Sequence, residues 1–457
     1  MANGRDRTPD EPTPNRRANS KRDLANQQRL MELGDAVDQR SGIKRKRRKG
    51  RRGGVRRKLI ISTLVLIGLL AGVVGGGYLY ADWRFGQIPK ITVKGEVKAI
   101  SGQPFNILMI GSDSRAGLSG LLAAQTGASA GSVSGQRSDS VKIVHVDPTA
   151  GTVSILSIPR DTMVTLLANQ SLYGQFNRIN VNFGKGPSLL AQTITANFGI
   201  PIHDTIVVSF AGLINAADAL GGVYLDFPYP SRDPYSDLVI THPGCQLIEG
   251  SSALAVTRSR HFYYNVKGVS TWPGNNASSS QLTNLGWVYD GTSDFGRIDR
   301  QSAFLRAMVN QAKKLYNPIT INSFLSKLPQ GISLDSNFSL NELIGLAVRF
   351  HGLSSSDLYT YTLPWLAATT PNLGDVLFVD QPYAQQMLVT IFGRQLLTPS
   401  NPPPNEALQT PLPPAVATTT TTVVTTTSGQ KKPPATKPAV NPTLAVPAYD
   451  PVPCTPS

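Results

Sequence analysis

The sequence predicts an α/β fold with a mixed central β-sheet flanked by helices, preceded by one transmembrane helix and followed by a disordered Pro/Thr-rich tail. Three observations support this prediction. Between residues 100 and 394, short apolar runs typical of strands alternate with longer runs of helical periodicity. An uncharged apolar stretch of 23 residues precedes this body, and a stretch of 60 residues with 15 Pro and 13 Thr follows it.

Residues 1–58 form a basic tail that we expect to be disordered and cytoplasmic. They hold 19 of the 44 Lys and Arg residues but only 7 of the 29 Asp and Glu residues, so most of the net charge of +15 lies here. Eleven of these cations crowd into residues 44–58. A basic run beside a membrane helix is typical of an orientation signal that meets anionic lipid head groups, so we expect a lipid bilayer and no nucleic acid as partner.

Residues 59–81 are predicted to cross the cell membrane once. A bilayer core requires about 20 apolar helical residues, whereas the alternative, a cleavable signal peptide, has an apolar region of only about 7–15 residues. Because the cations precede the span, the positive-inside rule places the N-terminus in the cytoplasm and residues 82–457 outside. Gly68, Gly72 and Gly76 repeat at a spacing that would let two copies pair as a homodimer.

We expect a linker over residues 82–103, one large domain over residues 104–397 and the tail over residues 398–457. Predicted strands cover residues 106–110, 141–146, 152–158, 205–209, 223–227 and 358–363. Predicted helices cover residues 187–198, 211–220, 300–315, 319–328 and 340–353. Such interleaving favours a mixed sheet covered by helices.

The chain has two cysteines, Cys245 in the domain and Cys454 near the end of the tail. This number excludes a disulfide-dense scaffold. Outside the membrane the two could form a disulfide that holds the end of the tail against the body.

The common enzyme signatures are absent from the sequence, which has no Walker phosphate loop, GxSxG, HExxH or CxxC. Instead, Arg and Asp gather at the ends of predicted strands, in GSDSR over residues 111–115, RSDS over residues 137–140 and PRD over residues 159–161. Because ligands of open α/β sheets bind beyond strand ends, these three segments could converge.

Further arginines extend this pattern. Arg258 and Arg260 project to one face of an extended segment, and Arg297, Arg300 and Gln301 share one side of a predicted helix start. Arginine binds phosphate oxygens with a permanent charge and a planar fork of donors. Several arginines without matched carboxylates indicate an anion with two phosphates.

Asp113 and Asp139 add hard oxygen ligands of the kind that Mg²⁺ uses together with substrate phosphates. A carboxylate is also the only plausible base that these motifs supply, and we favour Asp139 over Asp113 for this role.

With these motifs the chain resembles the LytR-CpsA-Psr (LCP) family of membrane-anchored envelope enzymes. The matching stretches, in the family's order, are NILMIGSDSR (106–115), RSDS (137–140), SIPRD (157–161), RIN (178–180), GGV (221–223), ALAVTRSR (253–260) and DFGRIDRQ (294–301). Two positions depart from the family pattern: Arg178 stands where Lys is usual, and Phe183 falls near a customary Tyr.

The resemblance implies an LCP-type α/β/α fold and a Mg²⁺-dependent phosphotransferase. This enzyme would move a glycan from a polyprenyl-pyrophosphate carrier to a hydroxyl of a cell-wall polymer, such as peptidoglycan, and leave a phosphodiester link. The prenyl chain would lie in an apolar tunnel to which residues 211–220 and 304–308 contribute.

The resemblance also assigns roles to residues. Arg160, Arg258, Arg260, Arg297 and Gln301 would hold the pyrophosphate, while Asp113 and Asp139 would bind Mg²⁺ or act as base. The residues that complete or support the pocket would be Arg115, Arg137, Asp161, Arg178, Asn180, Asp294 and Arg300. We expect Asp139, Asp113 and Arg160 to take part in catalysis directly.

Two other functions fit the same residues. Water admitted to the site would make the protein a pyrophosphatase of lipid-linked glycans. A membrane-tethered regulator of envelope biogenesis without enzymatic activity would bind such lipids and signal through the basic tail of 58 residues.

Overall fold

The structure is a computed structural model and describes residues 16–40, 52–114, 138–313, 318–352, 357–404 and 447–456. The chain divides into two compact units, Met1–Gly76 and Gly77–Ser457. Of the predicted low-complexity tail over residues 398–457, residues 405–446 lie outside the described residues.

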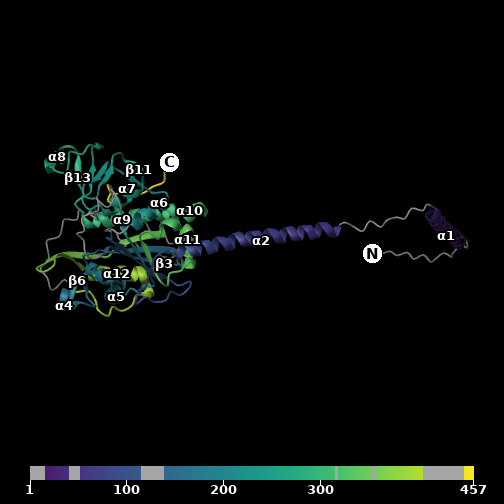
Figure 1. The fold of residues 1–457 in the computed structure, drawn as a ribbon, viewed down its shortest axis with the longest axis horizontal. Coiled ribbons are helices and arrows are strands. Elements are labelled where there is room, and N and C mark those ends of the chain that lie inside the picture. The colour runs from purple at the N-terminus through teal and green to yellow at the C-terminus, as the bar shows by residue number, and fades with distance from the viewer. Residues whose placement is uncertain are drawn as a thin grey trace, which may run out of the picture. The chain divides into compact units, whose positions relative to one another are not determined.

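The N-terminal part contains two helices, α1 (Arg16–Arg40) and α2 (Arg52–Phe85) (Figure 1). We expected disorder where α1 forms. Its Ala, Leu, Gln, Glu and Arg residues are good helix formers, which explains the helix although the side chains of residues 23–36 are exposed. Within α2, residues Arg57–Phe85 are long and apolar enough to cross a membrane. This helix includes the predicted span at residues 59–81 and indicates a single-pass membrane protein.

The second unit is built on a seven-stranded mixed sheet (Figure 1). Its strand order is β1 (Lys90–Ile91), β14 (Ile332–Asp335), β7 (Asp204–Val208), β2 (Phe105–Ser112), β3 (Ser138–Asp147), β4 (Thr152–Ile158) and β15 (Leu358–Thr362). Strands β1 and β14, β7 and β2, and β4 and β15 pair in parallel, and the other neighbours are antiparallel. The predicted mixed sheet is therefore confirmed.

Helices cover both faces of this sheet and complete the predicted α/β/α fold (Figure 1). One face packs on α5 (Pro187–Phe198) and α12 (Gln381–Phe392). The other packs on α6 (Phe210–Ala219), α9 (Asp294–Ala312), α10 (Pro318–Lys327) and α11 (Leu340–Gly352). Successive residues of β3 alternate between the two layers, so that Val141 and Ile143 join the first core and Val144 and Val146 the second.

Smaller sheets surround the central one. They are β5 (Met163–Thr165) with β6 (Phe176–Arg178), β16 (Trp365–Thr370) with β17 (Gly374–Val379), β8 (Val223–Phe227) with β11 (Gly244–Ile248) and β18 (Val452–Pro453), and β9 (Ser231–Asp233) with β10 (Leu238–Ile240), β12 (Tyr263–Asn265) and β13 (Trp287–Tyr289). The remaining helices are α4 (Gln170–Tyr173), α7 (Gly250–Arg258), α8 (Ser279–Asn284), η2 (Ile179–Lys185) and η4 (Gly393–Gln395).

The predicted elements are present with small shifts of their ends. The main differences concern three segments. Residues 223–227 form a strand of a separate sheet, the predicted helix at residues 300–315 begins already at Asp294, and the expected linker over residues 82–103 contributes β1 to the central sheet.

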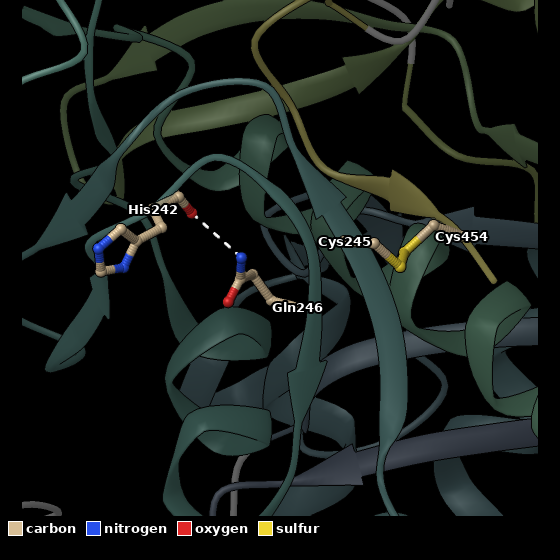
Figure 2. Close-up of a disulfide and its surroundings, with 4 residues drawn as sticks. All are labelled: His242, Cys245, Gln246 and Cys454. Atoms are coloured by element: carbon tan, nitrogen blue, oxygen red, sulfur yellow. Dashed lines mark hydrogen bonds between the residues drawn. A yellow bond between two sulfur atoms is a disulfide. The ribbon is translucent and has the colours of Figure 1, made fainter. Parts of the chain in front are cut away.

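The end of the chain is part of the body. Cys454 forms a disulfide with Cys245, as the sequence analysis expected (Figure 2). Strand β18 pairs with β8, and the buried Asp450 accepts a hydrogen bond of 2.7 Å from Arg300. Residues 447–456 therefore do not belong to an extended tail. Their few apolar and charged side chains find partners only in the folded body, which composition alone does not reveal.

We predict that Cys454→Ala lowers the free energy of unfolding by about 2–5 kcal/mol, because the disulfide closes a long loop in the unfolded chain. The two cysteines are 209 residues apart. Urea unfolding of the full chain in detergent, without reductant, measures this loss. Equal stability of variant and wild type would show that the disulfide does not hold the end of the chain.

A group of buried carboxylates lies where the chain enters the body. Thr205 donates hydrogen bonds through its hydroxyl to Glu96 at 2.6 Å and through its backbone N–H to Asp335 at 3.2 Å. Burial raises the pKa of Glu96 to about 7, and burial together with the neighbouring Asp335 raises the pKa of Asp204 to about 7. The folded state therefore keeps protons that the unfolded state releases near pH 4.

This difference predicts that stability falls as the pH rises from about 4 to 7, because protons stay bound only in the folded protein. Asp204→Asn removes one of these groups. We compare the free energy of unfolding of the variant with that of wild type. This difference should be on the order of 1–3 kcal/mol more favourable to the variant at pH 8 than at pH 5. Thermal unfolding at both pH values measures the change, and a variant that loses more at pH 8 than at pH 5 would contradict the assignment.

Candidate active site

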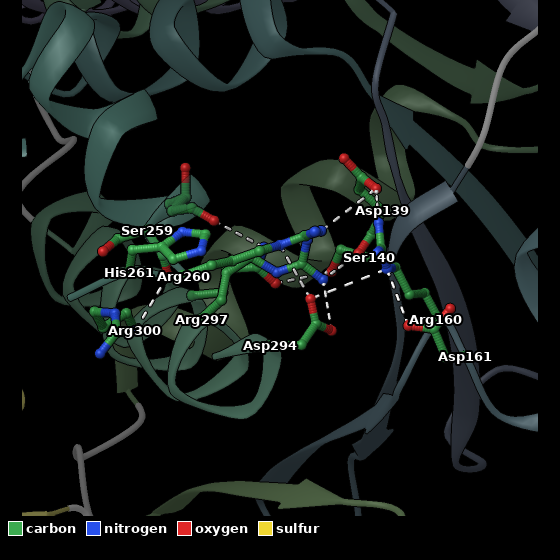
Figure 3. A network of polar contacts seen from close by, with 12 residues as sticks. Asp139, Ser140, Arg160, Asp161, Ser259, Arg260, His261, Asp294, Arg297 and Arg300 are labelled. Carbon is green, nitrogen blue, oxygen red and sulfur yellow. Dashed lines mark hydrogen bonds and ion pairs between the residues drawn. The ribbon is translucent and has the colours of Figure 1, made fainter. Parts of the chain in front are cut away.

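Arginine and aspartate side chains from four separate segments meet at one edge of the central sheet (Figure 3). Asp139 opens β3, Arg160 and Asp161 follow β4, Arg260 follows α7, and Asp294 and Arg297 lie in the first turn of α9. We call this group, together with Arg178 at the end of β6, the arginine cluster.

Arg160 lies at the centre of the arginine cluster (Figure 3). Its Nη1 donates to Asp139 Oδ1 at 3.0 Å, and its Nε contacts Asp161 Oδ2 at 3.3 Å and Asp294 Oδ1 at 4.0 Å. Burial alone would lower the pKa of Arg160, but these three carboxylates outweigh it and raise that pKa. Arg160 is therefore a permanent cation.

Two further arginines share the same carboxylates. Arg260 contacts Asp294 Oδ1 through Nε at 3.1 Å and Asp139 Oδ1 through Nη2 at 3.8 Å. Arg297 donates from Nη2 to Asp294 Oδ2 at 3.0 Å and to the backbone oxygen of Asp139 at 2.8 Å. Asp139 and Asp294 thus bridge segments that are far apart in the sequence.

Arg178 joins the cluster from the far side of Asp161. Its Nε lies 3.3 Å from Asp161 Oδ1, and its Nη2 donates to the backbone oxygens of Leu373 and Asp375. Asn180 donates its backbone N–H to the backbone oxygen of Arg160 at 3.3 Å. These contacts tie η2 and the β16–β17 hairpin to the segment that carries Arg160.

The expectation of arginines without matched carboxylates is wrong. Four guanidinium groups alternate with the carboxylates of Asp139, Asp161 and Asp294. Like charges held this close need opposite charges between them, which explains the pairing. The cluster still carries one more cation than anion.

One donor of Arg297, its Nε, forms no hydrogen bond within the arginine cluster. Its side chain is 3% exposed, and its Nε is buried with no hydrogen-bond partner among the residues that the structure describes. Burial lowers the pKa of Arg297 to about 10, so the group stays charged at neutral pH. A buried, charged and unpaired N–H group is costly unless an anion binds to it.

The other predicted residues have different surroundings. Gln301 accepts a hydrogen bond from Ser140 at 3.1 Å and donates to the backbone oxygen of Thr257 at 3.0 Å, which links α9 to β3 and α7. Arg258 is the last residue of helix α7, so the expected extended segment with Arg258 and Arg260 on one face is wrong. The Arg258 guanidinium lies 5.1 Å from the ring centre of Phe210, a cation–π contact.

Arg300 is not placed to bind a substrate. It is fully buried, pairs with Asp290 at 3.0 Å and Asp450 at 2.7 Å, and donates to the backbone oxygen of Ser259 at 3.1 Å. Helical spacing predicted that Arg297 and Arg300 share one side of the helix and both face the site. Arg300 instead pairs with the buried carboxylate of Asp450 on the C-terminal segment. Its contacts support the backbone that carries Arg260. Arg115 and Arg137 lie outside the described residues.

The two carboxylates predicted to bind a metal lie at neighbouring strand ends. Asp113 directly follows β2 and Asp139 lies in β3, and the register pairs Gly111 with Ser140. No group of three His, Cys, Asp or Glu side chains suited to a metal occurs in the described parts of the chain. Mg²⁺ needs only one or two carboxylates when substrate phosphates supply other ligands, so two carboxylates from adjacent strand ends fit it.

Two residues near the cluster were missed in the sequence analysis. Lys142 is buried in β3, donates to Ser157 at 2.6 Å, and has its pKa lowered to about 7 by burial. Asp233 is also buried and accepts hydrogen bonds from the backbone N–H groups of Arg260 and His261, both at 2.8 Å. A charge inside the apolar run VKIVHV was a signal for Lys142, whereas nothing local distinguishes Asp233.

The fold and the sequence both have relatives. The LytR_cpsA_psr family model matches residues 87–265 and 287–391. The probable cell wall biosynthesis protein LcpB of Corynebacterium glutamicum is 27% identical over 344 residues, which cover 73% of each chain. The polyisoprenyl-teichoic acid–peptidoglycan teichoic acid transferase TagV of Bacillus subtilis is 27% identical over 324 residues, covering 67% of this chain and 71% of TagV.

A solved structure, that of the LytR-Csp2A-Psr enzyme from Actinomyces oris, matches with a TM-score of 0.50 and 19% identity over 69% of this chain and 97% of that one. Fold, cluster and relatives together define a transferase of cell-wall biosynthesis. The chain belongs to the LytR-CpsA-Psr family, as its motifs indicated.

The excess positive charge and the converging guanidinium groups predict that the cluster binds a doubly phosphorylated anion. Inorganic pyrophosphate should raise the melting temperature of the full chain, because a ligand of the folded state stabilises it. In Arg260→Ala this increase should shrink, since one guanidinium group is lost. Thermal scans with increasing pyrophosphate measure both effects, and the same increase in wild type and variant would place the anion elsewhere.

Proposed function

We propose that this protein transfers a glycopolymer from a polyprenyl-pyrophosphate carrier to a hydroxyl group of a cell-wall polymer and leaves a phosphodiester link. One observation carries the proposal. Four guanidinium groups from segments far apart in sequence meet at one edge of the sheet, where they outnumber the three carboxylates between them. A pyrophosphate has the charge and the oxygens to replace aspartates as their partner.

The names of the relatives support this class of reaction. TagV is named as a transferase of teichoic acid from a polyisoprenyl carrier to peptidoglycan. TagV is 27% identical to this chain and supports the class of reaction, which is transfer of a glycopolymer to the cell wall.

A lipid chain has an apolar surface available beside the cluster. Partly buried apolar side chains lie between the sheet and its helices: Met109, Ile206 and Val208 on the sheet face, Met308 on α9 and Phe324 on α10. The same core includes Phe85, the last residue of the candidate membrane helix segment, and Ile88, which follows it. We propose that a prenyl chain lies against this face while its pyrophosphate reaches the arginine cluster.

In the proposed reaction the acceptor hydroxyl oxygen attacks the phosphorus next to the sugar, and a new P–O bond forms as the bond to polyprenyl phosphate breaks. Arg160, Arg260 and Arg297 hold the phosphates in line and neutralise their charge. Asp139, whose contacts with Arg160 and Arg260 both use Oδ1, accepts the hydroxyl proton on Oδ2.

Asp113 would hold Mg²⁺ together with the phosphates, and Asp139 would be a second ligand only in the alternative in which it is not the base. When bound, this ion would add positive charge beside the phosphate oxygens.

Because the Lys and Arg residues of positions 44–58 precede the membrane span, we propose that the N-terminus lies in the cytoplasm and the domain outside. Pairing of two copies through the membrane helix stays a prediction.

The proposal predicts that Arg160→Ala lowers transfer about 10- to 100-fold or more, because a charged hydrogen bond contributes roughly 1.5–3 kcal/mol. Arg160→Lys keeps the charge but loses the forked donors, so it should recover only part of the activity. Arg394→Ala, which removes an exposed arginine of η4, is the matched control and should transfer normally.

Transfer is measured with a lipid-linked oligosaccharide and an acceptor polymer, and the products are separated with and without the acceptor. A phosphodiester-linked product formed only with acceptor supports a transferase. Free glycan phosphate formed equally in both reactions would identify a pyrophosphatase instead. Full activity of Arg160→Ala would contradict the arginine cluster as the reaction site.

A further inference from the structure

A second functional surface lies on the four-stranded sheet next to the arginine cluster. In this sheet Tyr263 pairs across the strands with Tyr289 on one side and Arg232 on the other, so the three side chains project to the same face. Trp272 lies over this face, 5.3 Å from Tyr263 between ring centres. Together with Tyr235 and His261, the rings of Tyr263, Trp272 and Tyr289 form what we call the aromatic face.

The rings of the aromatic face form a continuous row. Ring centres are 4.3 Å apart for Tyr235 and His261, 6.5 Å for His261 and Tyr289, and 5.1 Å for Tyr289 and Tyr263. Tyr235 is 73% and Tyr289 43% exposed, and His261 is also exposed. Large aromatic side chains in such a row would normally bury their apolar area against a partner.

The exposed rings are not needed to build the core of this sheet. Its other face packs through Tyr264, which stacks on Tyr449 with ring centres 4.5 Å apart. The Arg232 guanidinium lies 5.5 Å from the ring centre of Trp272, and its Nε is buried without a hydrogen-bond partner in the described residues. The aromatic face thus presents apolar rings with a guanidinium group packed against Trp272.

Part of this surface lies outside the residues that the family model matches. The family model matches residues 87–265 and 287–391, so that residues 266–286, which contain Trp272, fall between the two matched ranges. This segment is anchored where it returns to the sheet, because Trp287 donates from its indole nitrogen to the backbone oxygen of Thr271 at 3.0 Å. Trp272 is therefore held in place, with its ring 5.1 Å from that of Trp287.

The aromatic face is joined directly to the arginine cluster. His261 follows Arg260 in the sequence (Figure 3). The backbone N–H groups of both donate to the same oxygen of Asp233 at 2.8 Å. Because this buried carboxylate fixes both residues, a molecule on the aromatic face has a defined position relative to the reacting phosphates.

We propose that the aromatic face binds the acceptor, an uncharged stretch of cell-wall polysaccharide, and presents its hydroxyl group to the arginine cluster; this inference rests on the proposed function. One face of a pyranose ring consists of C–H groups, which pack on aromatic rings and bury apolar area. The donor is already held through its pyrophosphate and its lipid. The acceptor has neither a pyrophosphate nor a lipid, so a separate surface such as the aromatic face must position it.

Binding is tested without the reaction. The full chain in detergent is titrated with a soluble hexamer of β-1,4-linked N-acetylglucosamine, and tryptophan fluorescence reports occupancy near Trp272. We expect Tyr235→Ala and Tyr289→Ala each to weaken binding about tenfold, and Tyr235→Phe to retain it because the ring remains. Tyr383→Ala removes a tyrosine of α12 that is 64% exposed and serves as the matched control.

Kinetics then separate the acceptor from the donor. For Tyr235→Ala we expect the KM of the acceptor to rise about tenfold while kcat and the KM of the donor stay unchanged. A rise in the donor KM alone would overturn the acceptor assignment. Equal hexamer binding by wild type and the Tyr235→Ala, Tyr289→Ala double variant would overturn the surface itself. A wild type that binds the hexamer but transfers nothing would contradict the proposed function and leave the binding surface standing.

Discussion

The site depends on the alternation of guanidinium and carboxylate groups at one edge of the central sheet. Four arginines at this distance would repel one another, and the carboxylates of Asp139, Asp161 and Asp294 hold them together. The same arrangement leaves Arg297 with a buried donor and no partner in the described chain. The pairing keeps the arginines in place before a doubly charged ligand arrives, so that little reorganisation is needed when it binds.

The rest of the body holds this arrangement in position from several directions. Asp233 fixes the backbone of Arg260, while Arg300 supports the preceding Ser259 and pairs with Asp450. The disulfide of Cys454 fastens the segment that carries Asp450. The last described residues of the chain therefore stabilise the site through Arg300, although they lie far from the site in the sequence.

Much of this could be predicted from the sequence because the signals are local. Strand and helix periodicity located the central sheet. A strand-end motif identified Arg160, and two further arginine-containing motifs identified Arg260 and Arg297. What failed depends on distant partners. Helical spacing placed Arg300 beside Arg297, but Asp450, 150 residues further on, determines its surroundings. The carboxylates between the arginines were read as metal ligands and supports, since sequence spacing does not show which charges face one another.

The most direct test of the central claim is a structure of the full chain bound to a short-chain prenyl pyrophosphate. Our account predicts that the two phosphates contact Arg160, Arg260 and Arg297 at the same time, with the prenyl group against the sheet face under α6 and α9. A complex in which these arginines keep their aspartate partners, and the phosphates lie elsewhere on the protein, would contradict it.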